Sequence, residues 1–320
     1  MKLDHLPLWL AAAVALATLL PARGALAAAL PWLTNGAVVL LLFLHGLRLS
    51  RAAMLAGLTH WRLHLLVAGV TFLAFPLIVL ALRWAMPGAL PAPLWGGLLF
   101  LSAAPSTVQS SIAFTALAGG NVAAAVCAAT LSNLGGVLVT PWLASALLGA
   151  GPQGVAGGVT GDQVLRVVAL ILLPTLAGQL ARPWAGAWAD GRARLLRAAD
   201  RAAILFIVYA AFSAAVVAGL WALVPPRALG ALLAVNLAVF ALAATVAWRL
   251  SARRAFSAAD RRTILFVGTT KSLATGAPIA GVLMPAPLVG ATILPLMLYH
   301  PVQSLVCSAL ASRWGARRSA

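Results

Sequence analysis

The sequence predicts an all-α integral membrane protein with ten transmembrane helices. First, the 320 residues are 63% hydrophobic and only 8% charged, with a mean hydropathy of +1.02. A soluble domain averages about 45–50% apolar and about 25% charged residues. Second, apolar runs of roughly 20 residues recur along the whole chain, as a helical bundle requires. Third, each half of the chain ends in two such runs joined by a very short link.

The apolar runs define ten predicted spans in one membrane domain that covers residues 1–320. Their ranges are 6–21, 29–48, 62–82, 93–118, 122–149, 164–181, 202–223, 229–249, 262–284 and 287–311. The short links are AGGN at 118–121, between the fourth and fifth spans, and MPAP at 284–287, between the ninth and tenth. No stretch between spans is long enough for a soluble domain.

The first run has a second interpretation as a signal peptide. It has Lys2 near its start, an apolar centre and small residues near its end. However, Asp4 is unusual in the positively charged beginning of a signal peptide. Removal of the run would also leave the two halves of the chain unequal. We therefore interpret it as the first span.

The basic residues fix the predicted orientation. With both termini and every second loop on one side, that side carries 17 Lys and Arg residues, against 4 on the other. By the positive-inside rule, both termini are expected in the cytoplasm of a bacterial cell, with the spans in its inner membrane. The formal net charge of +17 is thereby explained by topology. This distribution of basic residues predicts the lipid bilayer as the partner, and no nucleic acid is expected to bind.

The two halves, residues 1–150 and 151–320, resemble each other. TVQSSIA begins at Thr107 in the fourth span, and TTKSLA begins at Thr269 in the ninth, so that Gln109 corresponds to Lys271. Because each half has five spans, an odd number, the second half is inserted in the opposite orientation. Such inverted repeats are typical of secondary transporters, whose substrate site lies at the bilayer midplane.

Both corresponding segments are poor continuous helices. Pro105, Ser106 and Thr107 interrupt the fourth span, and residues 268–270 and 275–278 interrupt the ninth with glycine, threonine and proline. Broken helices at matching positions in two repeats indicate a transport site. The alternative is a pair of kinked helices with a purely structural role.

Several stretches resemble one known family. They are FLHGLRLS (43–50), APSTVQSSIAFTALAGGN (104–121), ATLSNLGGVLVTP (129–141), KSLATGAPIA (271–280) and LYHPVQSLVCSALASRW (298–314). In these the chain resembles the bile acid:sodium symporter superfamily, within its SBF-like branch. The resemblance implies a panel of spans 1, 2, 6 and 7, a core of spans 3–5 and 8–10, and crossing of the broken spans 4 and 9. It also implies transport of a small organic anion, often with sodium, between panel and core.

The chain departs from that family where sodium is bound. Sodium-coupled relatives carry an acidic residue and a glutamine at places that align with Phe266 and Thr270. The chain has no glutamate, and its five aspartates are expected in loops or at helix ends, so no carboxylate is expected within a span. Neutral oxygens remain as expected site groups, from Ser110, Ser111, Thr130, Ser132 and Asn133.

Lys271 is the central candidate residue. It lies nine residues beyond Arg262, which places it about 13 Å along a helix, near the centre of a roughly 30 Å core. A charge at that depth is costly unless it is paired or hydrated. Its ammonium could occupy the place of a sodium ion and donate to Ser110, Ser111 and broken-helix carbonyls. It could instead bind an anionic substrate, carry a proton in each cycle, or have only a structural role.

The remaining candidate residues are polar groups near Lys271 in sequence or by repeat symmetry: Gln109, Thr269, Thr270, Ser272 and His300. No cofactor and no metal centre is expected, because Cys127 and Cys307 lie in apolar spans and no paired-histidine motif is present.

Three functions stay open at this point. The leading one is a secondary transporter with Lys271 as a built-in cation or proton carrier, and the second is an ordinary sodium-coupled symporter. The third is an intramembrane hydrolase with a Ser–Lys dyad, formed by Ser110 or Ser111 and Lys271. The sequence leaves open the solute, the coupling ion, the direction of transport and the oligomeric state.

Overall fold

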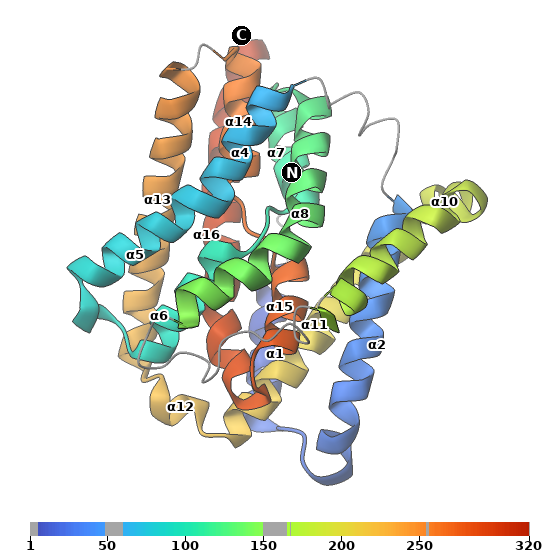
Figure 1. The fold of residues 1–320 in the computed structure, drawn as a ribbon, viewed down its shortest axis with the longest axis vertical. Coiled ribbons are helices and arrows are strands. Elements are labelled where there is room, and N and C mark those ends of the chain that lie inside the picture. The colour runs from blue at the N-terminus through green and yellow to red at the C-terminus, as the bar shows by residue number, and fades with distance from the viewer. Residues whose placement is uncertain (1–5, 49–59, 150–164, 167, 254–255, 320) are drawn as a thin grey trace.

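The computed structural model describes residues 6–48, 60–149, 165–166, 168–253 and 256–319, and within these ranges the chain forms helices and no strands (Figure 1). The first half contains α1 (Leu6–Leu19), α2 (Gly24–Arg48), α4 (Trp61–Gly69), a π-helical turn (Val70–Ala74), α5 (Phe75–Ala85), a 3-10 turn (Pro87–Ala89), α6 (Ala92–Ala103), α7 (Val108–Leu117) and α8 (Val122–Gly149). The second half contains a π-helical turn (Val168–Leu172), α10 (Leu173–Gly191), α11 (Ala193–Val217), α12 (Leu220–Leu223), α13 (Pro226–Arg253), α14 (Ala258–Thr269), α15 (Leu273–Leu283) and α16 (Ala286–Ser319).

The predicted all-α membrane protein is therefore confirmed. In the described part of the chain, six helical stretches are long and apolar enough to cross a membrane, or seven if the bent pair α6 and α7 counts as one span. Helices also lie within each of the ten predicted ranges. The count of ten spans and the inverted repeat stay predictions.

The expected breaks in the fourth and ninth spans are present. The fourth consists of α6 and α7, which are bent by 63° at a break over residues 104–107. The ninth consists of α14 and α15, separated by residues 270–272. The second expected interruption, at residues 275–278, is wrong, because these residues lie within α15 and Pro278 is inside the helix. Ser272 N–H donates to the Pro105 carbonyl over 2.8 Å. The two non-helical segments therefore contact each other.

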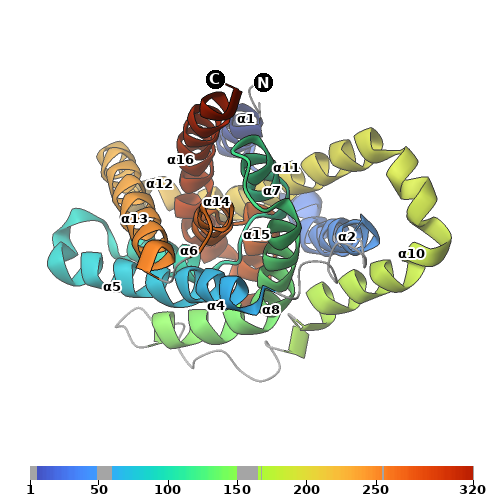
Figure 2. The same ribbon diagram turned by 90° about the horizontal axis from the view of Figure 1, so that it is seen from above.

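Helices α1, α2, α10 and α11 pack among themselves, with α2 against α10 and α11, and α1 against α11. Figure 2 shows α2 and α10 to one side of the remaining helices. The contact between α2 and α10 requires glycine. A Cβ on Gly46 would overlap the Thr175 carbonyl oxygen, and a Cβ on Gly178 would overlap that of Phe43. Small residues allow such close approach between membrane helices.

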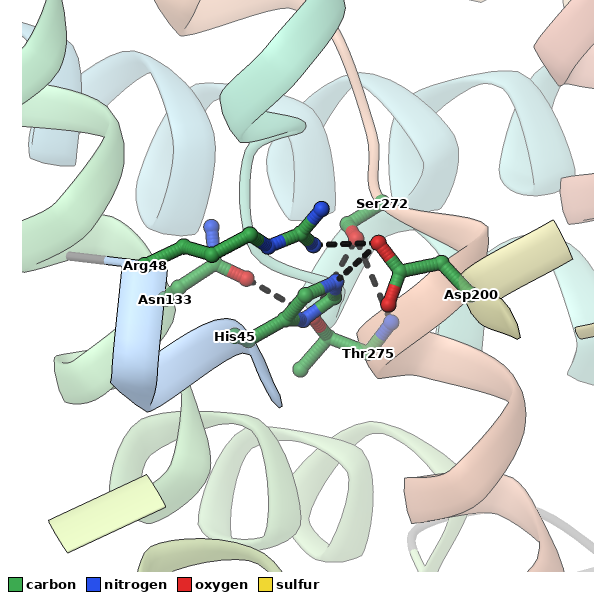
Figure 3. A network of polar contacts seen from close by, with 6 residues as sticks. All are labelled: His45, Arg48, Asn133, Asp200, Ser272 and Thr275. Carbon is green, nitrogen blue, oxygen red and sulfur yellow. Dashed lines mark hydrogen bonds and ion pairs between the residues drawn. The ribbon is translucent and has the colours of Figure 1, made fainter. Parts of the chain in front are cut away.

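Asp200 lies inside α11, which begins earlier than the predicted seventh span. The predicted seventh span started at 202, but α11 begins at Ala193, so Asp200 lies within a membrane-length helix and is 5% exposed. Arg48 of α2 forms an ion pair with it, and the His45 ring lies 3.8 Å away (Figure 3). The negative charge is therefore paired with arginine.

Candidate functional site

At the break between α6 and α7, the five consecutive carbonyl groups of residues 102–106 accept hydrogen bonds from other parts of the chain. A helix leaves its last four carbonyls without helical partners. Here Thr140 donates to the Ala103 carbonyl, Ser272 N–H to that of Pro105, and the Asn133 amide to that of Ser106. The remaining two, of Ser102 and Ala104, accept from Lys271. All five are therefore satisfied, and Lys271 alone serves two of them.

The Lys271 ammonium is held by three main-chain oxygens. Its Nζ donates to the carbonyls of Thr71, Ser102 and Ala104, each over 2.8 Å. The lysine residue is completely buried. Three donors on the ammonium thus meet three acceptors. We call this set of three carbonyls the carbonyl cage.

The Thr71 carbonyl, the third of the cage, has no partner within its own helix because of a proline. In the π-helical turn, the Phe75 N–H donates to the Val70 carbonyl, five residues back. The Thr71 carbonyl therefore loses its α-helical partner at residue 75. Its π-helical partner would be residue 76, which is proline and has no N–H. Lys271 supplies the missing donor.

The surroundings of the ammonium favour a positive charge without a carboxylate. The Nζ atom lies 4.1 Å from the centre of the Phe75 ring, and the face of an aromatic ring attracts a cation. The C-terminal end of α6, which supplies two of the carbonyls, carries partial negative charge from the helix dipole. Each hydrogen bond that the ammonium donates to the described residues goes to a carbonyl oxygen.

Polar side chains of α8 and α15 lie beside the same breaks. Thr275 donates to the Asn133 side-chain oxygen over 2.7 Å, and Ser272 accepts from the Thr275 N–H over 3.2 Å (Figure 3). Ser132 accepts from the Ser106 N–H over 3.0 Å. Of the predicted site residues, Ser132, Asn133 and Ser272 therefore do lie together at the breaks.

Thr269 and Thr270 immediately precede Lys271 and are buried, but their hydroxyls donate back into α14, to the carbonyls of Leu265 and Phe266. Their main-chain oxygens instead bind other elements. Tyr299 donates to the Thr269 carbonyl over 2.8 Å, and Ser106 donates to the Thr270 carbonyl over 3.2 Å.

The expected hydrogen bonds from Lys271 to Ser110 and Ser111 are wrong. The Ser111 hydroxyl donates to the Thr107 carbonyl one turn earlier in α7. The Ser110 hydroxyl has no hydrogen-bond partner among the described residues, and neither has that of Thr130. Gln109 is exposed. The main chain of the break, rather than these side chains, faces the ammonium.

Gln303 is a site residue that the prediction missed. It lies in α16, is 1% exposed, and bonds both main-chain groups of Lys271. Its amide nitrogen also lies 3.2 Å from His300 Nδ1. The predicted residue His300, 7% exposed, thus reaches Lys271 through Gln303. A glutamine inside an apolar span is itself a signal that could have identified it.

Comparison with known proteins matches residues 4–316 to the SBF-like CPA transporter family. The chain belongs to this family, within the bile acid:sodium symporter superfamily. It is 49% identical over 315 residues to "Uncharacterized protein PA2026" of Pseudomonas aeruginosa, covering 98% of this chain and 94% of the relative. It is 41% identical over 312 residues to "Putative symporter YfeH" of Escherichia coli, covering 98% and 93%. It is 29% identical over 287 residues to "Sodium/bile acid cotransporter 7" of Danio rerio, covering 87% and 82%.

Membership in this family confirms the resemblance seen in the sequence motifs and the prediction that the protein is a transporter rather than an enzyme. The geometry of the site also argues against the alternative of an intramembrane hydrolase. Lys271 Nζ bonds three carbonyls, and the Ser110 and Ser111 hydroxyls have the environments described above. No Ser–Lys dyad is therefore formed by these residues.

Proposed function

We propose that the protein is a secondary active transporter of a small organic anion in which Lys271 is a built-in cation. The observation that carries the proposal is the carbonyl cage. Three main-chain oxygens at 2.8 Å, supplied by two interrupted helices, surround one positive charge. Rings of carbonyls replace the hydration shell of a bound ion in membrane proteins. The ammonium takes the place such an ion would have.

The geometry favours a permanent cation over a proton carrier. An ammonium has three N–H donors, one for each carbonyl of the cage. A neutral amine has only two donors, and its lone pair would face a carbonyl oxygen and repel it. In the conformation described, loss of the proton would break one hydrogen bond and leave a buried carbonyl unsatisfied, at a cost of about 1–3 kcal/mol.

The proposed architecture has ten spans in two inverted five-helix repeats, residues 1–150 and 151–320. The panel comprises α1, α2, α10 and α11, and the core comprises the other spans, with α6–α7 and α14–α15 crossing. The mutual contact of the two breaks supports this. So does the packing of the four panel helices on one another.

We further propose that both termini are cytoplasmic, on the 17-to-4 distribution of basic residues, and that the membrane is a bacterial inner membrane, as the bacterial relatives support. In Figure 1 the start of α4, the end of α13 and the start of α14 gather at one end of the molecule, as this orientation requires. Alkaline phosphatase and fluorescent-protein fusions at residues 1 and 320 test it. Periplasmic phosphatase activity at either end would contradict it.

The anion would bind where polar groups of the core surround the breaks. Ser132, Asn133 and Ser272 are already hydrogen-bonded there, whereas the Ser110 and Thr130 hydroxyls have no partner in the described part of the chain and are available to a ligand. Gln109 is exposed next to Ser110. The positive charge of Lys271 would attract the anion without touching it.

The test is solute counterflow in proteoliposomes. Purified protein is first screened by thermal shift against carboxylates and sulfonates, with taurocholate included, because several relatives are named for bile acids. Any stabilising anion is then measured for exchange across the membrane. Exchange of the labelled anion that Lys271→Ala abolishes supports the proposal. Exchange unaffected by Lys271→Ala would contradict the role of the lysine.

A further inference from the structure

Residues 270–272 form the break in the ninth span, so the main-chain groups of Lys271 have no helical partners of their own. Such groups must find other partners when they are buried. Gln303 of α16 pairs both groups, and the Thr107 hydroxyl also donates to the Lys271 carbonyl over 2.9 Å. The Gln303 Oε1 accepts from Lys271 N–H over 2.6 Å, and its Nε2 donates to the Lys271 carbonyl over 3.0 Å. One side-chain amide thus pairs both groups, as a neighbouring β-strand residue would.

The orientation of this amide is fixed. Nε2 carries only donors, so the His300 Nδ1 atom 3.2 Å away acts as an acceptor. A flipped amide would place its oxygen against the Lys271 carbonyl and its NH2 group against the Lys271 N–H. The amide is also 1% exposed, so water does not compete for it.

The same helix holds the chain on the other side of Thr270. Tyr299, one turn before Gln303 in α16, donates to the Thr269 carbonyl over 2.8 Å. Together the two side chains fix the main chain immediately before and at Lys271. The side chain of Lys271 then extends from a fixed backbone to the carbonyl cage.

We propose that Gln303 is a positioning residue, which keeps the Lys271 ammonium in the carbonyl cage by clamping the Lys271 main chain. This inference rests on the proposed function of Lys271. Gln303 has no contact with the cage itself. Its effect is therefore indirect, and without the clamp the ammonium should leave the cage more often.

The experiment measures where the ammonium is, without any transport substrate. The chain contains only two lysines, Lys2 and Lys271. Reductive methylation of the protein in proteoliposomes with isotopic formaldehyde, followed by peptide mass spectrometry, therefore reports on Lys271 separately. Lys2 serves as the internal reference. We expect slow labelling of Lys271 in the wild type, because its amine is buried and fully hydrogen-bonded.

Gln303→Met removes both hydrogen bonds at similar side-chain length, and Gln303→Asn keeps the amide but is one methylene too short to reach. Each should label at Lys271 about tenfold faster than the wild type, or more, since two hydrogen bonds are lost. The control is Gln179→Met. Gln179 donates to the Gly46 carbonyl between α10 and α2, so this substitution removes a partly buried hydrogen bond elsewhere.

Faster labelling in both Gln303 variants, with wild-type labelling in Gln179→Met, supports the clamp. Wild-type labelling of Lys271 in Gln303→Asn or Gln303→Met, judged on folded protein by size-exclusion profile, would overturn it. Because labelling needs no substrate, this outcome is separate from failure of the proposed transport function. That function is judged by anion exchange in the wild type.

Discussion

Replacement of Lys271 by alanine, followed by return of the missing atoms as a small cation, tests the carbonyl cage in detail. Lys271→Ala removes three charge-assisted hydrogen bonds, each worth about 1.5–3 kcal/mol, and leaves three buried carbonyls without a donor. It also removes the cost of burying a charge, which is several kcal/mol. We expect a net loss of about 3 kcal/mol, which lowers the population of the assembled break roughly 100-fold.

The atoms lost beyond Cβ are three methylenes and an ammonium, which together correspond to n-propylammonium. This cation should raise the thermal stability of Lys271→Ala in detergent and restore part of its anion exchange in proteoliposomes. Tetramethylammonium is the matched control, since it carries the same charge but has no N–H to donate. The assay is a melting curve across a titration of each cation, with the wild type in parallel. Equal effects of the two cations, or wild-type stability and exchange in untreated Lys271→Ala, would refute the reasoning.

Three further predictions concern other parts of the molecule. Lys271→Arg should abolish anion exchange, because a planar guanidinium does not match three carbonyls arranged around a compact ammonium. Exchange at the wild-type rate would contradict this. Asp200→Asn should lower the free energy of unfolding by about 3 kcal/mol, since it leaves the largely buried Arg48 unpaired. Asp190→Asn, at an exposed ion pair, should cost under about 1 kcal/mol. Thermal melts that show equal losses for the two variants would contradict the difference in burial. Gly46→Ala should disrupt the contact of α2 with α10, while Gly36→Ala in the same helix, where a Cβ meets nothing within 4 Å, should be neutral or stabilising; similar melts for both would argue against the close approach.

The sequence was sufficient to predict the helical membrane fold, the two breaks and the burial of Lys271. Proline and clustered hydroxyl residues at 105–107, and glycine and threonine at 268–270, indicated where the two helices are broken. A lone lysine far from a helix end must find internal partners. The identity of those partners was harder to predict. Which main-chain carbonyls lose their helical partners depends on where each helix ends, and side-chain types do not show this directly.

Particular residues explain the errors. Ser111 was expected at the ammonium, but α7 begins at Val108, so its hydroxyl bonds the preceding turn, as serine in a helix often does. Thr71 was missed because its contribution is a carbonyl, although Pro76 marks that carbonyl in the sequence. The seventh span was predicted to start at 202, but α11 begins at Ala193 and includes Asp200, since the arginines at 194, 197 and 201 fit a helix.

The central claim is that a lysine replaces the coupling cation, and a sodium titration tests it most directly. Initial rates of anion uptake into proteoliposomes are measured at fixed pH and constant ionic strength while choline is exchanged for sodium. The cage is already filled by the Lys271 ammonium, so we expect wild-type uptake to be the same with and without sodium. Uptake that strictly requires sodium would contradict the claim and indicate an ordinary sodium symporter.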